Sequence, residues 1–152
     1  IDRSLAPSPP VFRLVQLERN EHLELENFPT AQNVTLIRLW GANCLVCVIE
    51  SSLVIYDYRK QEVRLTLTGH NDEILAVDAR DPEILATLAK DAVVRLWNGR
   101  TGQCIEEVQI PEASFYLGYP YCLSVSGHRI LASADEGVFL VELDTSPEAR
   151  EV

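Results

Sequence analysis

The stretch AKDAVVRLWNGRTGQC, residues 89–104, decides the fold of this chain. Its apolar run ends at Trp97, Asn98 follows, and Gly99 and Gly102 mark a tight turn. Valine-rich runs that stop at Asn, Gly and Thr are typical of β-strands joined by turns. Similar runs of Val, Ile, Leu and Tyr recur along the chain, and none keeps the ~3.6-residue apolar period of a helix. The sequence therefore predicts an all-β protein.

The expected strands are short and are bounded by Gly, Asn, Asp, Ser and Pro. They cover residues 11–17, 22–28, 34–40, 44–49, 53–58, 62–67, 73–79, 83–88, 92–98, 103–110, 120–126, 129–134, 137–143 and 147–152. The prolines of SLAPSPP, residues 4–10, indicate an extended linker over residues 1–10.

Three segments of the chain repeat one pattern of strands and polar turns. They are residues 44–67, 83–108 and 129–152. LVIYD (53–57) matches VVRLWN (93–98) in its last three positions, and ILAT (84–87) matches ILAS (130–133). A period of about 40–45 residues is that of one four-stranded unit in a repeat architecture.

Gly69-His70 followed by Trp97-Asn98 resembles the G-H…W-D signature of the WD-repeat (WD40) β-propeller family, with Asn98 in place of the usual Asp. The well-formed repeat is residues 69–110. The flanking repeats are degenerate, because Tyr56-Asp57 and Leu143-Asp144 stand where Trp-Asp is expected.

The resemblance implies a partial β-propeller of about three four-stranded antiparallel blades, at residues 33–68, 69–110 and 111–152. Residues 11–28 would supply the end of a preceding blade. Propellers generally close with about four to eight blades. The chain begins at Ile1 and contains no Met. We therefore expect a segment of a larger propeller, with the rest of its own propeller as one partner.

The charge balance of the chain is acidic, with 23 Asp and Glu against 13 Lys and Arg and a net charge of -10. Phosphate backbones need clustered Lys and Arg, so we expect no nucleic acid partner. No apolar run approaches the ~18 residues of a membrane span, and no signal-peptide pattern opens the chain. We expect an intracellular protein, cytoplasmic or nuclear, with no membrane partner.

Cys44 and Cys47 form a C-x-x-C motif that could indicate half a zinc site or a redox pair. On a strand, however, residues three apart point to opposite faces, so the two thiols should diverge. We interpret both as core cysteines and expect neither a metal nor a cofactor.

His70, Thr87 and Asp91 carry the ingredients of nucleophilic catalysis within one repeat. The resemblance assigns these residues and Trp97 to a buried structural network instead. In that network the hydroxyl accepts the indole proton and donates to the imidazole, whose tautomer the carboxylate fixes. A nucleophile elbow such as G-x-S-x-G is absent from the sequence.

The two other histidines carry no functional signal. Gly127-His128 precedes Ser133 too closely to match Gly69-His70, so His128 is expected in an exposed turn. His22 is also expected in a polar turn.

Candidate protein contacts lie on one rim of the expected disc. The loops between blades meet there with the turns that join the second and third strands of each blade. The matching residues are Asn71, Asp72, Glu73 and Lys90. In EASFYLGYPY (112–121), Phe115, Tyr116 and Tyr119 stand where the third blade lacks its Gly-His. Clustered loop aromatics are typical of interface hot spots, and they can equally pack between blades. Both interpretations stay open from the sequence.

The resemblance implies a non-catalytic scaffold that binds other proteins or peptides. One alternative is a substrate-receptor propeller of a ubiquitin ligase of the F-box/WD type, which an F-box outside these residues would distinguish. A remote alternative is a hydrolase that uses His70, Thr87 and Asp91.

Overall fold

The computed structural model describes residues 13–29 and 34–143, and these residues form strands and turns. No helix in this part of the chain is long and apolar enough to cross a membrane. The strands are β1 (Arg13–Gln16), β2 (Glu21–Glu24), β3 (Val34–Trp40), β4 (Cys44–Ile49), β5 (Ser52–Asp57), β6 (Glu62–Leu67), β7 (Ile74–Asp78), β8 (Ile84–Ala89), β9 (Val93–Asn98), β10 (Cys104–Gln109), β11 (Leu123–Ser126), β12 (Arg129–Ala134) and β13 (Gly137–Glu142).

The all-β prediction is confirmed, and each of these strands overlaps an expected one. His22 is a correction, since it lies in β2 rather than in a turn. The expected strand at 147–152 and the linker at 1–10 lie outside the described residues.

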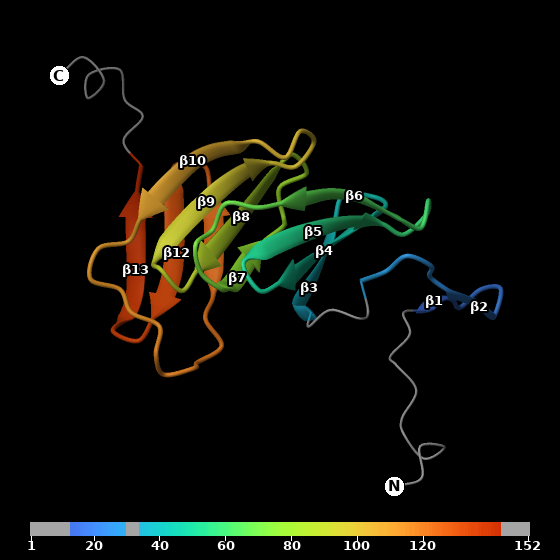
Figure 1. Cartoon of the computed structure of the whole chain (residues 1–152), viewed down its shortest axis with the longest axis horizontal. Helices are drawn as coiled ribbons and strands as arrows, with labels where there is room; N and C mark the ends of the chain where they lie inside the picture. The colour runs from blue at the N-terminus through green and yellow to red at the C-terminus, as the bar shows by residue number, and fades with distance from the viewer. Residues whose placement is uncertain (1–12, 30–33, 144–152) are drawn as a thin grey trace, which may run out of the picture.

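Each sheet is an antiparallel meander of sequential strands (Figure 1). The order is β3-β4-β5-β6 in sheet I, β7-β8-β9-β10 in sheet II and β11-β12-β13 in sheet III. β1 and β2 form a separate hairpin. Sheet I lies within the predicted repeat 33–68, sheet II within 69–110 and sheet III within 111–152.

Apolar cores fill the spaces between neighbouring sheets. Sheets I and II enclose Val46, Ile55, Leu85 and Trp97, and sheets II and III enclose Leu88, Val94 and Ile130 in the same way. The outer face of sheet I packs against Leu25, which follows the hairpin. Sheets packed face to face in this order are the arrangement of propeller blades, each of which is stabilised by its neighbours.

Cys44 and Cys47 lie on opposite faces of β4, as expected. Cys44 belongs to the core between sheets I and II, whereas Cys47 faces the hairpin side. Burial raises the pKa of the Cys47 thiol to about 11. Within the described ranges no group of three or more His, Cys, Asp and Glu residues could hold a metal ion.

The strand pairing in sheet III shows that the predicted alignment of ILAS (130–133) with ILAT (84–87) is wrong by one residue. Ile130 pairs with Val141 and faces sheet II, just as Leu85 pairs with Trp97 and faces sheet I. Ala132 therefore occupies the position of Thr87. A shift of one residue moves a strand side chain to the opposite face.

Two further predictions for the third repeat change with this register. Ser133 Oγ lies on the other face and accepts a hydrogen bond from Cys122 N at 2.8 Å. By the same pairing, Val141-Glu142 and not Leu143-Asp144 stands at the Trp97-Asn98 position. His128 lies exposed in the turn between β11 and β12, as predicted.

Candidate functional site: a buried network and an exposed rim

The structure brings His70, Thr87 and Trp97 together in the core between sheets I and II. Trp97 Nε1 donates to Thr87 Oγ1 at 2.9 Å, and His70 Nε2 lies 2.5 Å from the same oxygen. Thr87 is fully buried, and His70 and Trp97 are 7% and 2% exposed. The hydroxyl accepts the indole proton and can still donate its own to the imidazole, so one threonine satisfies two rings.

Asp91 is a correction to this network. Its Oδ1 accepts a hydrogen bond from Val93 N at 3.1 Å, which closes the turn between β8 and β9. His70 Nδ1 is buried and has no hydrogen-bond partner. The carboxylate therefore stabilises its own turn and does not hold the imidazole.

Burial of Thr87 also excludes the hydrolase alternative for His70, Thr87 and Asp91. A nucleophile has to reach its substrate, and Thr87 exposes no surface and already contacts two rings. Without a hydrogen bond to Asp91, the imidazole also lacks the orienting carboxylate of a triad.

Electrostatics keep His70 neutral near pH 7. Burial lowers its pKa from 6.5 to about 4, an effect that Asp91 opposes and Arg95 reinforces. A neutral ring can accept the threonine proton at Nε2, which a protonated ring cannot.

Packing explains why the residue before His70 is a glycine. Its φ is 147°, and a Cβ there would lie 2.7 Å from Arg95 Nη1 and 3.3 Å from the Trp97 ring. A larger residue would have to displace the Arg95 side chain and would crowd the indole that Thr87 holds. The Gly-His pair therefore packs directly on the Trp of its own repeat.

Sheet I repeats this arrangement with other residues. Tyr56 stands at the position of Trp97, and its hydroxyl donates to Glu26 O. Asp57 Oδ1 accepts from Arg59 N and Lys60 N, both at 2.9 Å. Asn98 Oδ1 accepts from Arg100 N and Thr101 N in the same way. Asn98 thus stabilises its turn as an aspartate does.

The rim is the edge of the sheets where the predicted contact residues lie, and it comprises three turns and two connections. The turn after β4 meets the start of β7 through Ile74 N and Glu50 O, 2.8 Å apart. The turn after β8 meets the connection before β7 through Lys90 N and Glu73 O, also 2.8 Å apart. The turn after β12 meets the connection between β10 and β11 through Asp135 N and Ser114 O.

Asn71, Asp72, Glu73 and Lys90 are all exposed on this rim. With Glu50, the first three line a groove of about 400 Å³ between sheets I and II. Asp72 Oδ1 accepts from Glu73 N at 2.8 Å, which shapes the loop beside the groove.

The aromatic connection between β10 and β11 divides into a buried anchor and an exposed tip. Phe115 is 3% exposed and packs in the core between sheets II and III, with its ring centroid 4.9 Å from that of Tyr121. Its assignment as a contact residue is therefore wrong. Tyr116 and Tyr119 remain exposed by 82% and 56%, and Leu117 between them by 61%.

Two carboxylates of the turn after β12 hold this connection. Asp135 accepts hydrogen bonds from Tyr116 N at 2.6 Å and from the Tyr121 hydroxyl at 2.5 Å. These hydrogen bonds keep the Asp135 pKa below its usual value, although burial acts in the opposite direction. Glu136 accepts from Ser114 N and Ser114 Oγ. The exposed rings therefore project from a fixed loop.

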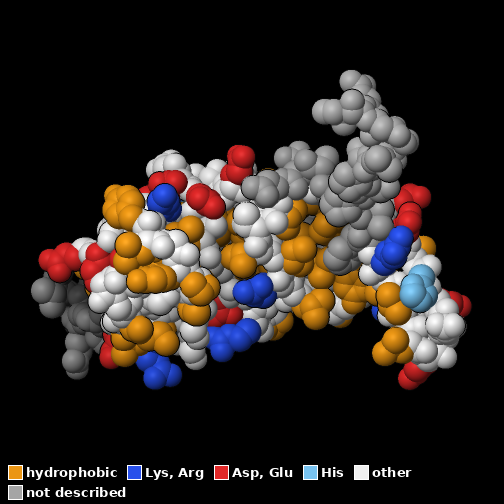
Figure 2. Space-filling view, turned by 90° about the horizontal axis from the view of Figure 1, so that it is seen from below, with side chains coloured by type: hydrophobic (Ala, Val, Ile, Leu, Met, Phe, Trp, Pro, Cys, Tyr) orange, Lys and Arg blue, Asp and Glu red, His pale blue; other side chains and the backbone are white. Residues whose placement is uncertain are grey.

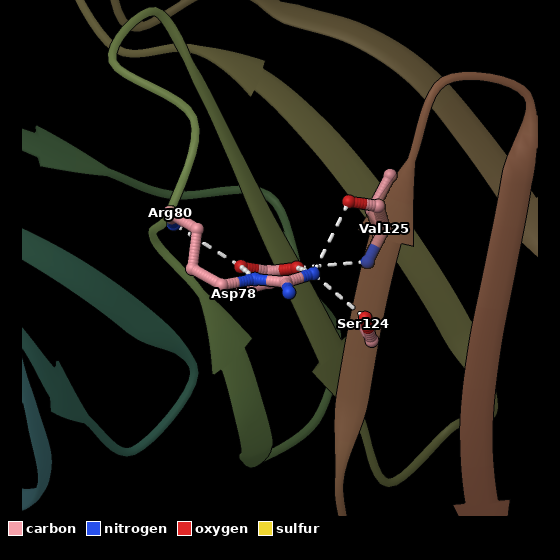
Figure 3. A network of polar contacts seen from close by, with 4 residues as sticks. All are labelled: Asp78, Arg80, Ser124 and Val125. Atoms are coloured by element: carbon pink, nitrogen blue, oxygen red, sulfur yellow. Dashed lines mark hydrogen bonds and ion pairs between the residues drawn. The ribbon is translucent and has the colours of Figure 1, made fainter.

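Sequence reasoning missed an ion pair at the end of β7 that is hydrogen-bonded to sheet III. Asp78 is buried at the end of β7, and Arg80 bonds both of its oxygens (Figure 3). Arg80 Nη2 also donates to Ser124 Oγ at 2.7 Å on β11. Val125 N donates to Asp78 Oδ2 at 2.7 Å. The only sequence signal was a D-x-R spacing after an apolar strand, which carries little information by itself.

Trp40 was also missed, and it joins sheets I and II. Its Nε1 donates to Asp81 O at 2.9 Å, and its ring lies on Gly99, where a Cβ would come within 2.2 Å of the indole. Packing against Trp40 therefore requires glycine at position 99.

Comparison with known proteins gives relatives for parts of the chain, and no family model matches it. The chain is 29% identical to pre-mRNA-processing factor 19 of Caenorhabditis elegans over 104 residues, which is 68% of this chain and 20% of that protein. It is 33% identical to THO complex subunit 3 of Arabidopsis thaliana over 57 residues, covering 36% of this chain and 18% of that protein. The chain thus spans about a fifth of the length of these relatives.

Solved structures show the fold. The β-propeller domain of Myceliophteria thermophila Cps50 (Swd1) superposes with a TM-score of 0.61 at 24% identity, covering 76% of this chain and 37% of that chain. The computationally designed Ika4 protein gives 0.60 at 18% identity, covering 73% and 66%.

The relatives are WD-repeat proteins. The repeat that contains sheet II carries both markers, Gly69-His70 and Trp97-Asn98, in contact with one another. The motifs, the sheets and these likenesses show that the chain resembles WD-repeat proteins and has the fold of β-propeller blades.

Proposed function

We propose that this chain is a non-catalytic scaffold that binds other proteins or peptides through its rim. One observation carries the proposal: Tyr116, Leu117 and Tyr119 are exposed together at the tip of a loop that Asp135 and Glu136 hold in place. We call these three residues the aromatic tip.

The aromatic tip has the physical properties of a contact surface. Grouped apolar side chains in water favour a partner that covers them. A loop that is already ordered loses little conformational entropy on binding, so more of the contact energy appears as affinity. Tyr is also among the residues enriched at interface hot spots. The acidic charge of the chain supports protein partners over nucleic acid.

An intracellular location, in the cytoplasm or the nucleus, is part of the proposal. One relative is named for pre-mRNA processing, which takes place in the nucleus. The described cysteines are all free thiols, as reducing compartments favour.

Site-specific photocrosslinking tests the scaffold proposal in cells. A photoreactive phenylalanine analogue replaces Tyr116 in the whole protein, and the same analogue replaces Val63, which is 44% exposed on β6 of sheet I, as the control. We expect a discrete adduct with another protein at position 116 that is absent at position 63. Equal adducts at both positions, or none at 116, would contradict the assignment.

A further inference from the structure

We infer that the rim selects a peptide segment that combines an aromatic or aliphatic side chain with a neighbouring Lys or Arg. This inference rests on the proposed scaffold function and specifies the chemistry of its partner. The apolar side chain would cover the aromatic tip, and the cation would lie over the acidic part of the rim.

The apolar half of the site is the aromatic tip itself. Tyr116 is the most exposed of its three residues, at 82%. The backbone amides of Tyr116 and Leu117 both donate to Asp135. With these amides already paired, side chains rather than backbone groups are offered to a ligand. An apolar side chain is the natural counterpart of such a surface.

The acidic half lies next to it along the rim. Lys90 connects the two halves, because its Nζ lies 5.9 Å from the Tyr116 ring centroid and its backbone N donates to Glu73 O. Beyond Glu73, the groove between sheets I and II exposes Glu50 and Asp72 as well. None of these three carboxylates forms an ion pair among the described residues.

Charge complementarity decides between possible occupants of the surface. Three exposed carboxylates on a chain of net charge -10 attract a cationic segment and repel an anionic one. Lys90 is a basic residue between the two halves of the site, and its positive charge repels the Lys or Arg of the peptide. Replacing Lys90 should therefore strengthen binding of a basic peptide.

Selection from a library of short random peptides displayed on phage tests the inference with the folded chain as bait. We expect enriched peptides to combine Phe, Tyr, Trp or Leu with Lys or Arg. One enriched peptide, synthesised with a fluorophore, then reports affinity by anisotropy for each variant. A thermal melt of each variant checks its folding.

Matched variants separate the two halves of the site. Asp72→Lys/Glu73→Lys should weaken the peptide about tenfold or more, and Asp72→Asn/Glu73→Gln, which alters the loop less, should weaken it by a smaller factor. Lys90→Glu should tighten it. Glu18→Lys/Glu21→Lys applies the same charge change within the β1–β2 hairpin and should leave affinity unchanged. Tyr116→Ala/Tyr119→Ala should also abolish most of the binding.

The outcomes distinguish the inference from the proposal beneath it. Enriched peptides without Lys or Arg, or affinity that survives both changes at Asp72 and Glu73, would overturn the inference and leave the scaffold function standing. Peptides that bind the Tyr116→Ala/Tyr119→Ala variant as well as the wild type would place the site elsewhere. No enrichment over an unrelated bait would overturn both.

Discussion

Thr87 shows how one small side chain can stabilise two large ones. Its hydroxyl contacts the indole of Trp97 and the imidazole of His70 at a place without solvent access. Such an arrangement is favourable only while each polar atom has a partner. Removing one donor therefore costs more than the hydrogen bond itself contributes.

Replacing Trp97 by Phe keeps an aromatic ring and removes the indole N–H. We expect the free energy of unfolding to fall by about 1–3 kcal/mol, the cost of a buried polar group that loses a partner. Urea denaturation measures the change. Trp40→Phe is the comparison, because its Nε1 donates to the more accessible Asp81 O and should matter less. An unaltered unfolding midpoint for Trp97→Phe would show that this hydrogen bond does not stabilise the fold.

The low pKa of His70 predicts acid sensitivity. Because its pKa is about 4 in the folded chain against an ordinary 6.5, the unfolded chain takes up the proton first. The stability that neutral His70 contributes is complete above about pH 6.5 and is lost as the pH falls toward about 4.

Urea unfolding of the wild type and of His70→Gln, from about pH 7.5 to about pH 4.5, isolates this effect. The difference in unfolding free energy between them should shrink as the pH falls, because only the wild type titrates at this position. The carboxylates titrate in both proteins and cancel in the difference. A constant difference over the whole range would mean that His70 is not held neutral by its surroundings.

At the scale of elements, turns and connections rather than strands distinguish the repeats. Asp57 and Asn98 shape equivalent turns in sheets I and II. The connection before β7 carries Gly69-His70, whereas the connection before β11 carries the aromatic tip. In the third repeat, Asp135 rather than a buried histidine therefore holds the connection that leads into the first strand.

Asp135→Asn should loosen the aromatic tip. The amide keeps the size of the carboxylate but removes its charge and one acceptor, while three backbone or hydroxyl donors point at it. Hydrogen exchange at the amides of Tyr116 and Leu117 should become faster, with little change for the amides of β8 and β9. Glu142→Gln, a carboxylate on the exposed side of β13, serves as the control. Equal exchange in both variants would show that the clamp does not order the loop.

Across the whole molecule, the two ends of the stacked sheets differ. The outer face of sheet I packs against Leu25, but sheet III exposes Leu131, Val138 and Leu140 by 44%, 70% and 58%. Figure 2 shows hydrophobic side chains exposed at the end that holds sheet III and the loop before it. By strand pairing, these positions match Ala86, Val94 and Leu96, which sheet III covers in sheet II.

The 152-residue chain should therefore self-associate in dilute solution, because a bare blade face favours any apolar surface that covers it. Light scattering coupled to sizing chromatography measures the mass. Leu131→Lys/Leu140→Glu should shift the population toward the monomer, whereas Val63→Lys on β6 should not. A wild-type monomer with cooperative unfolding would mean that this face needs no cover.

Strands and repeats were predictable because their signals are local. Period-2 alternation and turn residues such as Asn98 and Gly102 act within a few positions, and each strand of the described residues overlaps its prediction. The β-propeller class was likewise predictable from the sequence alone, because it is marked by Gly69-His70 and Trp97-Asn98.

Only the tertiary structure decided which face of a sheet a side chain occupies and which residues it contacts. The sequence determined that ILAS was a strand, but its register placed Ala132 and not Ser133 opposite sheet II. It determined that residues 112–121 were an aromatic loop, but packing buried Phe115 and left Tyr116 in solvent. Asp78 and Arg80 are near neighbours whose role depends on β11, more than 40 residues away. A side chain's partner is set by contacts between distant segments, and no local pattern encodes which side chain will occupy the space that those segments share.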